Sequence, residues 1–88
     1  MQAIRAATRG NLTLLRKLLK DGVDLNARDD EGNTALIWAA RESNIEIMQL
    51  LVDANADINA KDDDGDTALI VATLNDETEG VQLLVDAK

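Results

Sequence analysis

Apolar residues recur three and four positions apart in short segments of the chain, and polar stretches separate these segments. In the middle of the chain the apolar positions are Leu36, Ala39 and Ala40, followed by Ile47, Leu50 and Leu51. This spacing places each group on one face of a helix and predicts two short amphipathic helices. Since such a pair cannot bury its apolar faces alone, we expect it to stack on neighbouring pairs.

The pattern returns with a period of 33 residues. Residues 29–55 are identical to residues 62–88 at 15 of 27 positions, and residues 3–29 are identical to residues 36–62 at 9 of 27. A fixed period of this length is typical of an array of small structural units. We therefore expect a single repeat domain over the whole chain. Its copies span approximately residues 1–29, 30–62 and 63–88.

Local residues predict where the helices begin. Thr34 is expected to cap a first helix that runs to about Arg41, because its hydroxyl can accept from a free amide of the first turn. Residues 43–46, Ser-Asn-Ile-Glu, match a capping box, in which the Ser43 hydroxyl and a glutamate satisfy the first amides of the second helix. Residues 76–79 offer a similar arrangement in the next copy.

Other residues predict the turns. The second helix is expected to end at Gly22 in the first copy and at Asn55 in the middle one, since glycine and asparagine best tolerate a left-handed backbone. Residues 29–32 and 62–65 each have Asp first and Gly fourth, the preference of a type I β-turn. These turns should form protruding tips between copies.

These segments resemble the ankyrin repeat family, whose unit of 33 residues is a turn followed by two antiparallel helices. Residues 34–37 and 67–70, Thr-Ala-Leu-Ile, are similar to the family's Thr-Pro-Leu-His, and residues 56–60 are similar to its Ala-Asp-Val-Asn-Ala. Because Ile replaces the histidine, the threonine–histidine hydrogen bond of that family cannot form, and apolar packing takes its place. The resemblance implies an all-α repeat protein, an ankyrin-like solenoid of stacked helix pairs with short β-turn fingers.

The amino-acid composition excludes most kinds of catalytic site. Hydrophobic residues make up 45% of the chain, Trp38 is its one aromatic residue, and cysteine and histidine are absent. Disulfides, thiolate and imidazole metal sites, and catalytic triads are therefore excluded. We expect no enzymatic activity and no cofactor.

Charge narrows the choice of partner. The net charge is −8, with +4 on residues 1–28 and −12 on the remainder. This balance disfavours nucleic acid and anionic membranes, so we expect a neutral or basic protein partner. Neither a secretory signal nor a membrane span is recognisable, which predicts a cytoplasmic protein.

The acidic turns do not match the spacing of a calcium loop. An EF-hand needs carboxylates at positions 1, 3 and 5, glycine at 6 and glutamate at 12. With Gly65 at the sixth position, Ala60 falls at the first and Val71 at the twelfth; with Gly32 there, Ala27 falls at the first. No metal site is therefore predicted, and the aspartates are interpreted as turn formers.

Positions that change between copies are the candidates for partner binding, because packing fixes the positions that repeat. The resemblance also implies binding through the turn tips and the exposed side of the first helix. The candidates, expected to line one concave side, are Arg5, Thr8, Arg9, Arg28, Asp30, Glu31, Asn33, Trp38, Arg41, Glu42, Lys61, Asp63, Asp64, Asp66, Val71, Leu74 and Asn75. Trp38 either contacts a partner, as interface tryptophans often do, or fills space between copies.

Two functions remain open. The first is a non-catalytic interaction module that binds a neutral or basic protein through its concave face. The second is a self-associating, cut-down or engineered scaffold that forms a weak homodimer or a head-to-tail contact. It is favoured by the apolar residues of the last copy, Leu69, Ile70, Val71 and Leu74, and by Gly80, which replaces the aliphatic Ile47.

Overall fold

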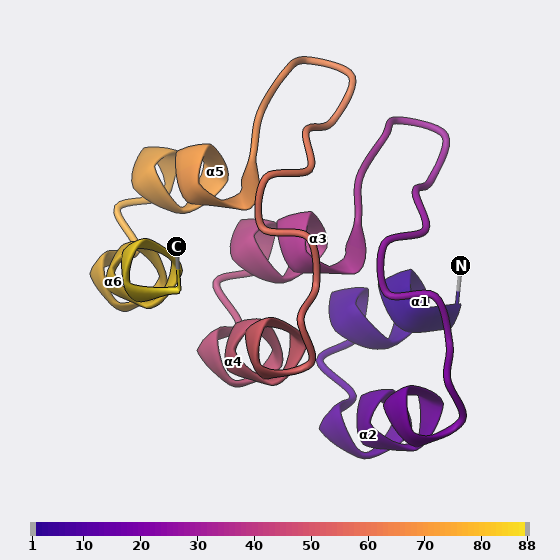
Figure 1. Ribbon diagram of the computed structural model, residues 1–88. Helices are drawn as coiled ribbons and strands as arrows, with labels where there is room; N and C mark the ends of the chain where they lie inside the picture. The colour runs from indigo at the N-terminus through magenta and orange to yellow at the C-terminus, as the bar shows by residue number, and fades with distance from the viewer. Residues whose placement is uncertain (1, 88) are drawn as a thin grey trace.

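The computed structural model describes residues 2–87, which form six helices in three consecutive pairs (Figure 1). The pairs are α1 (Gln2–Thr8) with α2 (Leu12–Lys20), α3 (Ala35–Arg41) with α4 (Ile45–Asp53), and α5 (Ala68–Leu74) with α6 (Thr78–Asp86). Helices α1, α3 and α5 form an inner row beside the protruding loops, and α2, α4 and α6 form an outer row (Figure 1). Residues 2–87 contain no strand, so the expected all-α repeat architecture is confirmed.

The predicted cap of the inner helices is confirmed. Thr34 precedes α3, and its hydroxyl accepts a hydrogen bond from the amide of Ile37 at 3.3 Å. Thr67 does the same for Ile70 at the start of α5. Helix α3 ends at Arg41, as expected from the sequence.

The capping box expected at residues 43–46 does not form. Helix α4 begins one residue later, and the Asn44 side chain accepts from the amide of Ile47 at 3.1 Å. Ser43 instead takes a left-handed backbone, with φ of +52°, in the turn that joins the two helices. Asp76 at the equivalent position has φ of +56°, and Glu77 precedes α6 without a side-chain cap. Gly10, one period before Ser43, was the sequence signal for this turn.

The turns after the outer helices are as predicted. Gly22 and Asn55 have φ of +79° and +67°, which is the left-handed conformation expected at these two positions. The chain can therefore leave α2 and α4 sharply and return towards the inner row. This return carries it into the protruding loop that begins the next pair.

The core runs between the helix pairs. The alanines of α3, Ala39 and Ala40, have no exposed surface, which lets neighbouring inner helices approach closely. Ile47 and Leu51 of α4 are also fully buried, whereas Leu50, expected in the same seam, is only half-buried. None of the helices within residues 2–87 has the length and apolar character needed to cross a membrane.

The two protruding loops, which we call fingers, comprise residues 29–33 and 62–66. In each, the amide of the glycine donates to the carbonyl of the first aspartate at 3.0 Å, which closes the predicted turn. The fingers also touch one another, because the Asp63 amide donates to the Glu31 carbonyl at 3.0 Å. A Cβ on Gly32 would lie 2.9 Å from the Asp63 nitrogen, so this approach requires glycine.

The two ends of the stack differ from its middle. Ile37 of α3 is 1% exposed, whereas Ile70, one period later in α5, is 41% exposed. Leu74 and Val85 are exposed on the same last pair. We call Ile70, Leu74 and Val85 the end face. One period earlier, the residues equivalent to Ile70 and Val85 are Ile37 and Val52, and their helices adjoin a following helix pair.

Gly80→Ala should stabilise the protein. Gly80 lies inside α6, where alanine is favoured over glycine by about 0.5–1 kcal/mol. The new methyl would sit 3.1 Å from Glu77 Cγ and 3.3 Å from Met48 Cε, both in flexible side chains that can move. We expect a higher midpoint of urea unfolding. A lower midpoint would mean that the Met48 and Glu77 side chains cannot move away from the added methyl group.

Candidate functional site

Each finger is organised by the side chain of its first aspartate. The Asp29 carboxylate accepts the amides of Glu31 at 3.0 Å and Asn33 at 2.9 Å. One period later the Asp62 carboxylate accepts the amides of Asp64 and Asp66, both at 2.9 Å. Because these bonds hold the backbone of the loop, the side chains at the tip are carried on an ordered framework.

Trp38 joins the first finger to α3. Its indole Nε1 donates to Asp29 Oδ2 at 2.8 Å, and the ring is half-buried. The Arg41 guanidinium lies 5.9 Å from the ring centroid, within the range of a cation–π interaction. Trp38 therefore has a structural role in the finger while part of its surface stays open to solvent.

Arg41 links the two fingers. Its Nε donates to Asn33 Oδ1 of the first finger at 3.3 Å, and its NH2 group donates to Asp62 Oδ2 of the second at 2.6 Å. The Asp62 side chain is 3% exposed and that of Arg41 is 36% exposed. The ion pair thus neutralises a buried carboxylate, and loss of Arg41 would leave that charge without its partner.

The fingers, α3 and α5 line two neighbouring recesses, both of which include Arg41. The larger, of about 290 Å³, is lined by Glu31, Asn33, Trp38, Arg41, Asp62, Asp63 and Asp64. The smaller, of about 210 Å³, is lined by Arg41, Asp66, Val71, Leu74 and Asn75. We call the two recesses, with the exposed tips of both fingers, the finger face.

The finger face contains eleven of the residues proposed from the sequence, ten that line the recesses and Asp30 at a tip. Two of them are not surface residues as expected: Asn33 is 3% exposed and Val71 is 4% exposed. The Asn33 side chain is buried because it bridges Asp29 and Arg41, and Val71 lies buried in the α5 packing. Asp30 is exposed at the tip of the first finger, next to the larger recess.

The other candidates lie around or away from these recesses. Arg5 and Arg9 are exposed on and just after α1, and the Thr8 hydroxyl donates to the Arg5 carbonyl at 2.9 Å. Glu42 is exposed after α3. Arg28 and Lys61 flank the fingers and are joined by a bond from the Arg28 guanidinium to the Lys61 carbonyl, 2.6 Å long.

Asp29 and Asp62 were missing from the residues proposed from the sequence. They were set aside because they are identical between copies, and identical positions were assigned to packing. That reasoning was correct for their backbone role but missed the side-chain bonds to Trp38 and Arg41. The available signal was a pair of hydrogen-bond donors, Trp38 and Arg41, at variable positions of the helix that follows a repeated aspartate.

The ionisation of Asp29 is coupled to these contacts. Burial acts to raise the pKa of its carboxyl, but the hydrogen bonds from Trp38, Asn33 and the Glu31 amide outweigh burial, so the pKa is lowered. A lowered pKa means that ionised Asp29 stabilises the fold above the unfolded pKa of about 3.9. This contribution is lost as the pH falls through the lowered folded pKa.

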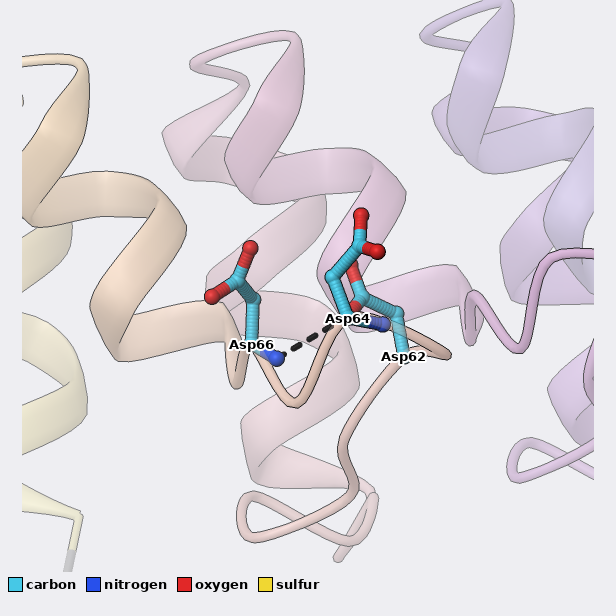
Figure 2. A group of neighbouring side chains, drawn as sticks. All are labelled: Asp62, Asp64 and Asp66. Carbon is cyan, nitrogen blue, oxygen red and sulfur yellow. Dashed lines mark hydrogen bonds between the residues drawn. The ribbon is translucent and has the colours of Figure 1, made fainter.

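Three aspartates of the second finger lie together. Oxygens of Asp62, Asp64 and Asp66 lie within 4.8 Å of one another, and Figure 2 shows the Asp66 amide bonded within the group. The oxygens of Asp62 already accept two backbone amides and the Arg41 guanidinium. Asp64 and Asp66 are thus the two carboxylates left for an ion, whereas calcium takes six to eight oxygens.

Trp38→Phe should raise the pKa of Asp29, because it removes the indole donor while keeping an aromatic ring. We expect a loss of about 1 kcal/mol of stability at neutral pH and a smaller loss once the pH falls below the lowered folded pKa of Asp29, where the carboxylate is protonated in both proteins. Carboxyl ¹³C NMR titration and urea unfolding followed by circular dichroism measure both quantities. An unchanged pKa would show that the indole bond does not stabilise the carboxylate.

Calcium should not stabilise the fold. The carboxylates left free by Asp62 are too few for a defined site, so melting curves with EDTA and with millimolar calcium should nearly coincide. The two samples need equal ionic strength, since screening alone changes the stability of an acidic protein. A calcium-dependent rise of several degrees would overturn this expectation.

Comparison with known families agrees with the architecture and the repeat. The family model described as Ankyrin repeats (3 copies) matches residues 2–88. No curated protein matched the sequence. Proteins of this family are generally non-catalytic and bind other proteins. With six helices in three stacked pairs and a family match over nearly the whole sequence, the chain belongs to the ankyrin repeat family.

Proposed function

We propose that this protein is a non-catalytic interaction module whose finger face binds a neutral or basic protein. The observation that carries the proposal is the exposed acidic surface of the fingers. Asp30, Glu31, Asp63 and Asp64 are exposed at the tips, and Asp66 is half-buried beside them. Within residues 2–87 the ion pairs are Lys17–Asp21 and Arg41–Asp62, so none of these five carboxylates is paired there.

The framework beneath these charges supports binding without large rearrangement. The Asp29 and Asp62 bonds hold each loop, and Arg41 holds one loop to the other. Less entropy is therefore lost when a partner orders the tips. Clustered negative charge would attract a basic partner over a distance, and this attraction would weaken with salt.

Apolar contacts complete the proposed surface. Leu74 is 73% exposed at the edge of the smaller recess, and Trp38 presents part of its ring in the larger one. An aliphatic side chain flanked by lysine or arginine would suit these recesses. The same acidic tips disfavour nucleic acid and anionic membranes, and the proposal places the protein in the cytoplasm.

Trp38 makes the proposal directly testable, since it is the sole tryptophan and lies in the larger recess. A synthetic lysine-rich peptide containing one leucine should change the Trp38 fluorescence in a saturable way. Its glutamate-rich counterpart should not. Asp63→Asn with Asp64→Asn should weaken binding of the lysine peptide about tenfold, and higher salt should weaken it further.

The matched control is Glu46→Gln with Glu79→Gln, which removes the same number of exposed charges from α4 and α6 in the outer row. This variant should bind the lysine peptide nearly as well as the unaltered protein. Equal weakening by both variants would mean that net charge alone attracts the peptide. Such a result would contradict a specific role for the fingers.

Self-association through the end face is the second candidate function, favoured by the exposure of Ile70, Leu74 and Val85. Residues 1–28 carry +4, so the first helix pair of another copy could meet the acidic last pair in a head-to-tail contact. Because its two surfaces differ, such a contact need not close and can grow. A swapped terminal helix pair would instead give a closed homodimer.

Light scattering coupled to size exclusion at high micromolar concentration tests this second candidate. We expect a mass above that of the monomer in low salt, and a lower mass for Leu74→Gln, which removes an exposed aliphatic group while keeping helix propensity. A monomer mass at both low and high salt would remove self-association through the end face. The finger-face proposal would be unaffected.

A further inference from the structure

The outer row of helices lies on the side of the molecule opposite the fingers (Figure 1). It carries two grooves. The first, between α2 and α4, has a volume of about 640 Å³ and is lined by Arg16, Lys17, Leu19, Lys20 and Leu50. The second, between α4 and α6, has a volume of about 260 Å³ and is lined by Gln49, Val52, Asp53, Leu83, Asp86 and Ala87. Neither groove belongs to the finger face or the end face.

The two grooves are the same structure one period apart. Leu19 and Leu50 in the first groove correspond to Val52 and Leu83 in the second, and all four side chains are half-buried. The grooves therefore share an aliphatic floor. Their rims do not correspond in charge, because Lys20 of the first groove is replaced by Asp53 of the second.

The first groove is a basic site on an acidic protein. Arg16, Lys17 and Lys20 lie on its α2 side, and Lys17 pairs with Asp21 at 3.2 Å. Both members of that pair are largely exposed, so it is weak. Across the groove, α4 contributes Glu46, Gln49 and Asp53 to the exposed surface, and the Gln49 amide donates to Asp53 at 2.8 Å.

The charged residues that line the second groove are both acidic. Asp53 and Asp86 line it, and Glu79 is exposed on the same helix as Asp86. The Asp86 carboxylate accepts the Gln82 amide at 2.8 Å, and residues 62–87 include no lysine or arginine. The two grooves thus present matching apolar floors and opposite charges on one face.

We propose that the outer row is a self-association surface, on which the basic groove of one copy meets the acidic groove of a second copy. A twofold axis parallel to α4 would set α2 of each copy opposite α6 of the other. Lys20 would then face the second copy's Asp86, and the contact would occur twice. An arrangement of this kind is closed, so it yields dimers and no larger species.

The area of the outer row limits the strength of the proposed dimer. A helix of nine residues is about 13 Å long, and three helices about 10 Å apart cover roughly 400 Å². Stable interfaces bury about 800 Å² per partner, so the dimer is weak and forms at high micromolar to millimolar concentration. Asp53 of each copy lies near the axis, where its charge opposes the contact.

Charge exchange tests the proposal on the intact protein. Lys20→Asp and Asp86→Lys each place like charges opposite one another, so each variant alone should associate at least fivefold more weakly in sedimentation equilibrium at low salt. The double variant should recover the association of the unaltered protein. An equimolar mixture of the two single variants should also recover it, because each mixed pair restores opposite charges at both contacts.

If repulsion between the net charges of two copies governed association, the two single variants would behave differently from one another. Lys20→Asp changes the net charge from −8 to −10, whereas Asp86→Lys changes it to −6 and would strengthen association if only net charge mattered. Arg9→Asp, at an exposed position just after α1 and outside both grooves, makes the same charge change as Lys20→Asp and should leave this dimer intact. Circular dichroism checks that each variant is folded.

Three outcomes would overturn the proposal. They are a monomer at millimolar concentration, no recovery in the mixture, and equal weakening by Arg9→Asp. Leu74→Gln separates this dimer from the end-face contact, since it removes an end-face residue that touches neither groove. Failure of either form of self-association would leave the finger-face function untouched.

Discussion

Each helix pair of this protein exposes an apolar seam that only the next pair can cover, and this need for stacking governs the rest of the structure. Seven- and nine-residue helices are too short to be stable alone. Ala39 and Ala40 have no exposed surface because α3 lies between α1 and α5. The same close stacking brings the two fingers into contact and makes glycine necessary at position 32.

Stacking also explains why equivalent residues have different environments. Ile37 and Ile70 occupy the same position in successive copies, and their exposed fractions are 1% and 41%. The difference comes from the neighbour: α5 packs on α3, whereas α5 itself has α3 on one side only within residues 2–87. The apolar end face is therefore a property of position in the array, and residue type does not reveal it.

Single substitutions give equivalent positions of this repeated framework different contacts and charges. Asp29 and Asp62 hold their loops in the same way, but Trp38 bonds the first and Arg41 bonds the second. The outer row follows the same principle, with Lys20 and Asp53 at equivalent positions of two similar grooves. Each face thus combines a constant geometry, set by packing, with charges that packing leaves free to vary.

The sequence by itself determined the fold class, the period, the threonine caps and the left-handed ends at Gly22 and Asn55. These features depend on local backbone chemistry and on spacing, which a single chain displays directly. The shift of the cap from Ser43 to Asn44 has a sequence signal only in the first copy, at Gly10; at Ser43 itself the left-handed turn is imposed by how the helices of a pair must meet.

Tertiary structure also decided the side-chain links of the finger face. Trp38 bonds an aspartate nine residues earlier, and Arg41 bonds one that lies 21 residues later, in the second finger. Bonds over such separations require the loops and helices to be in place, so no local pattern specifies them. The burial of Asn33 and Val71 has the same origin, because the fraction of a side chain that stays exposed depends on which segments pack against it.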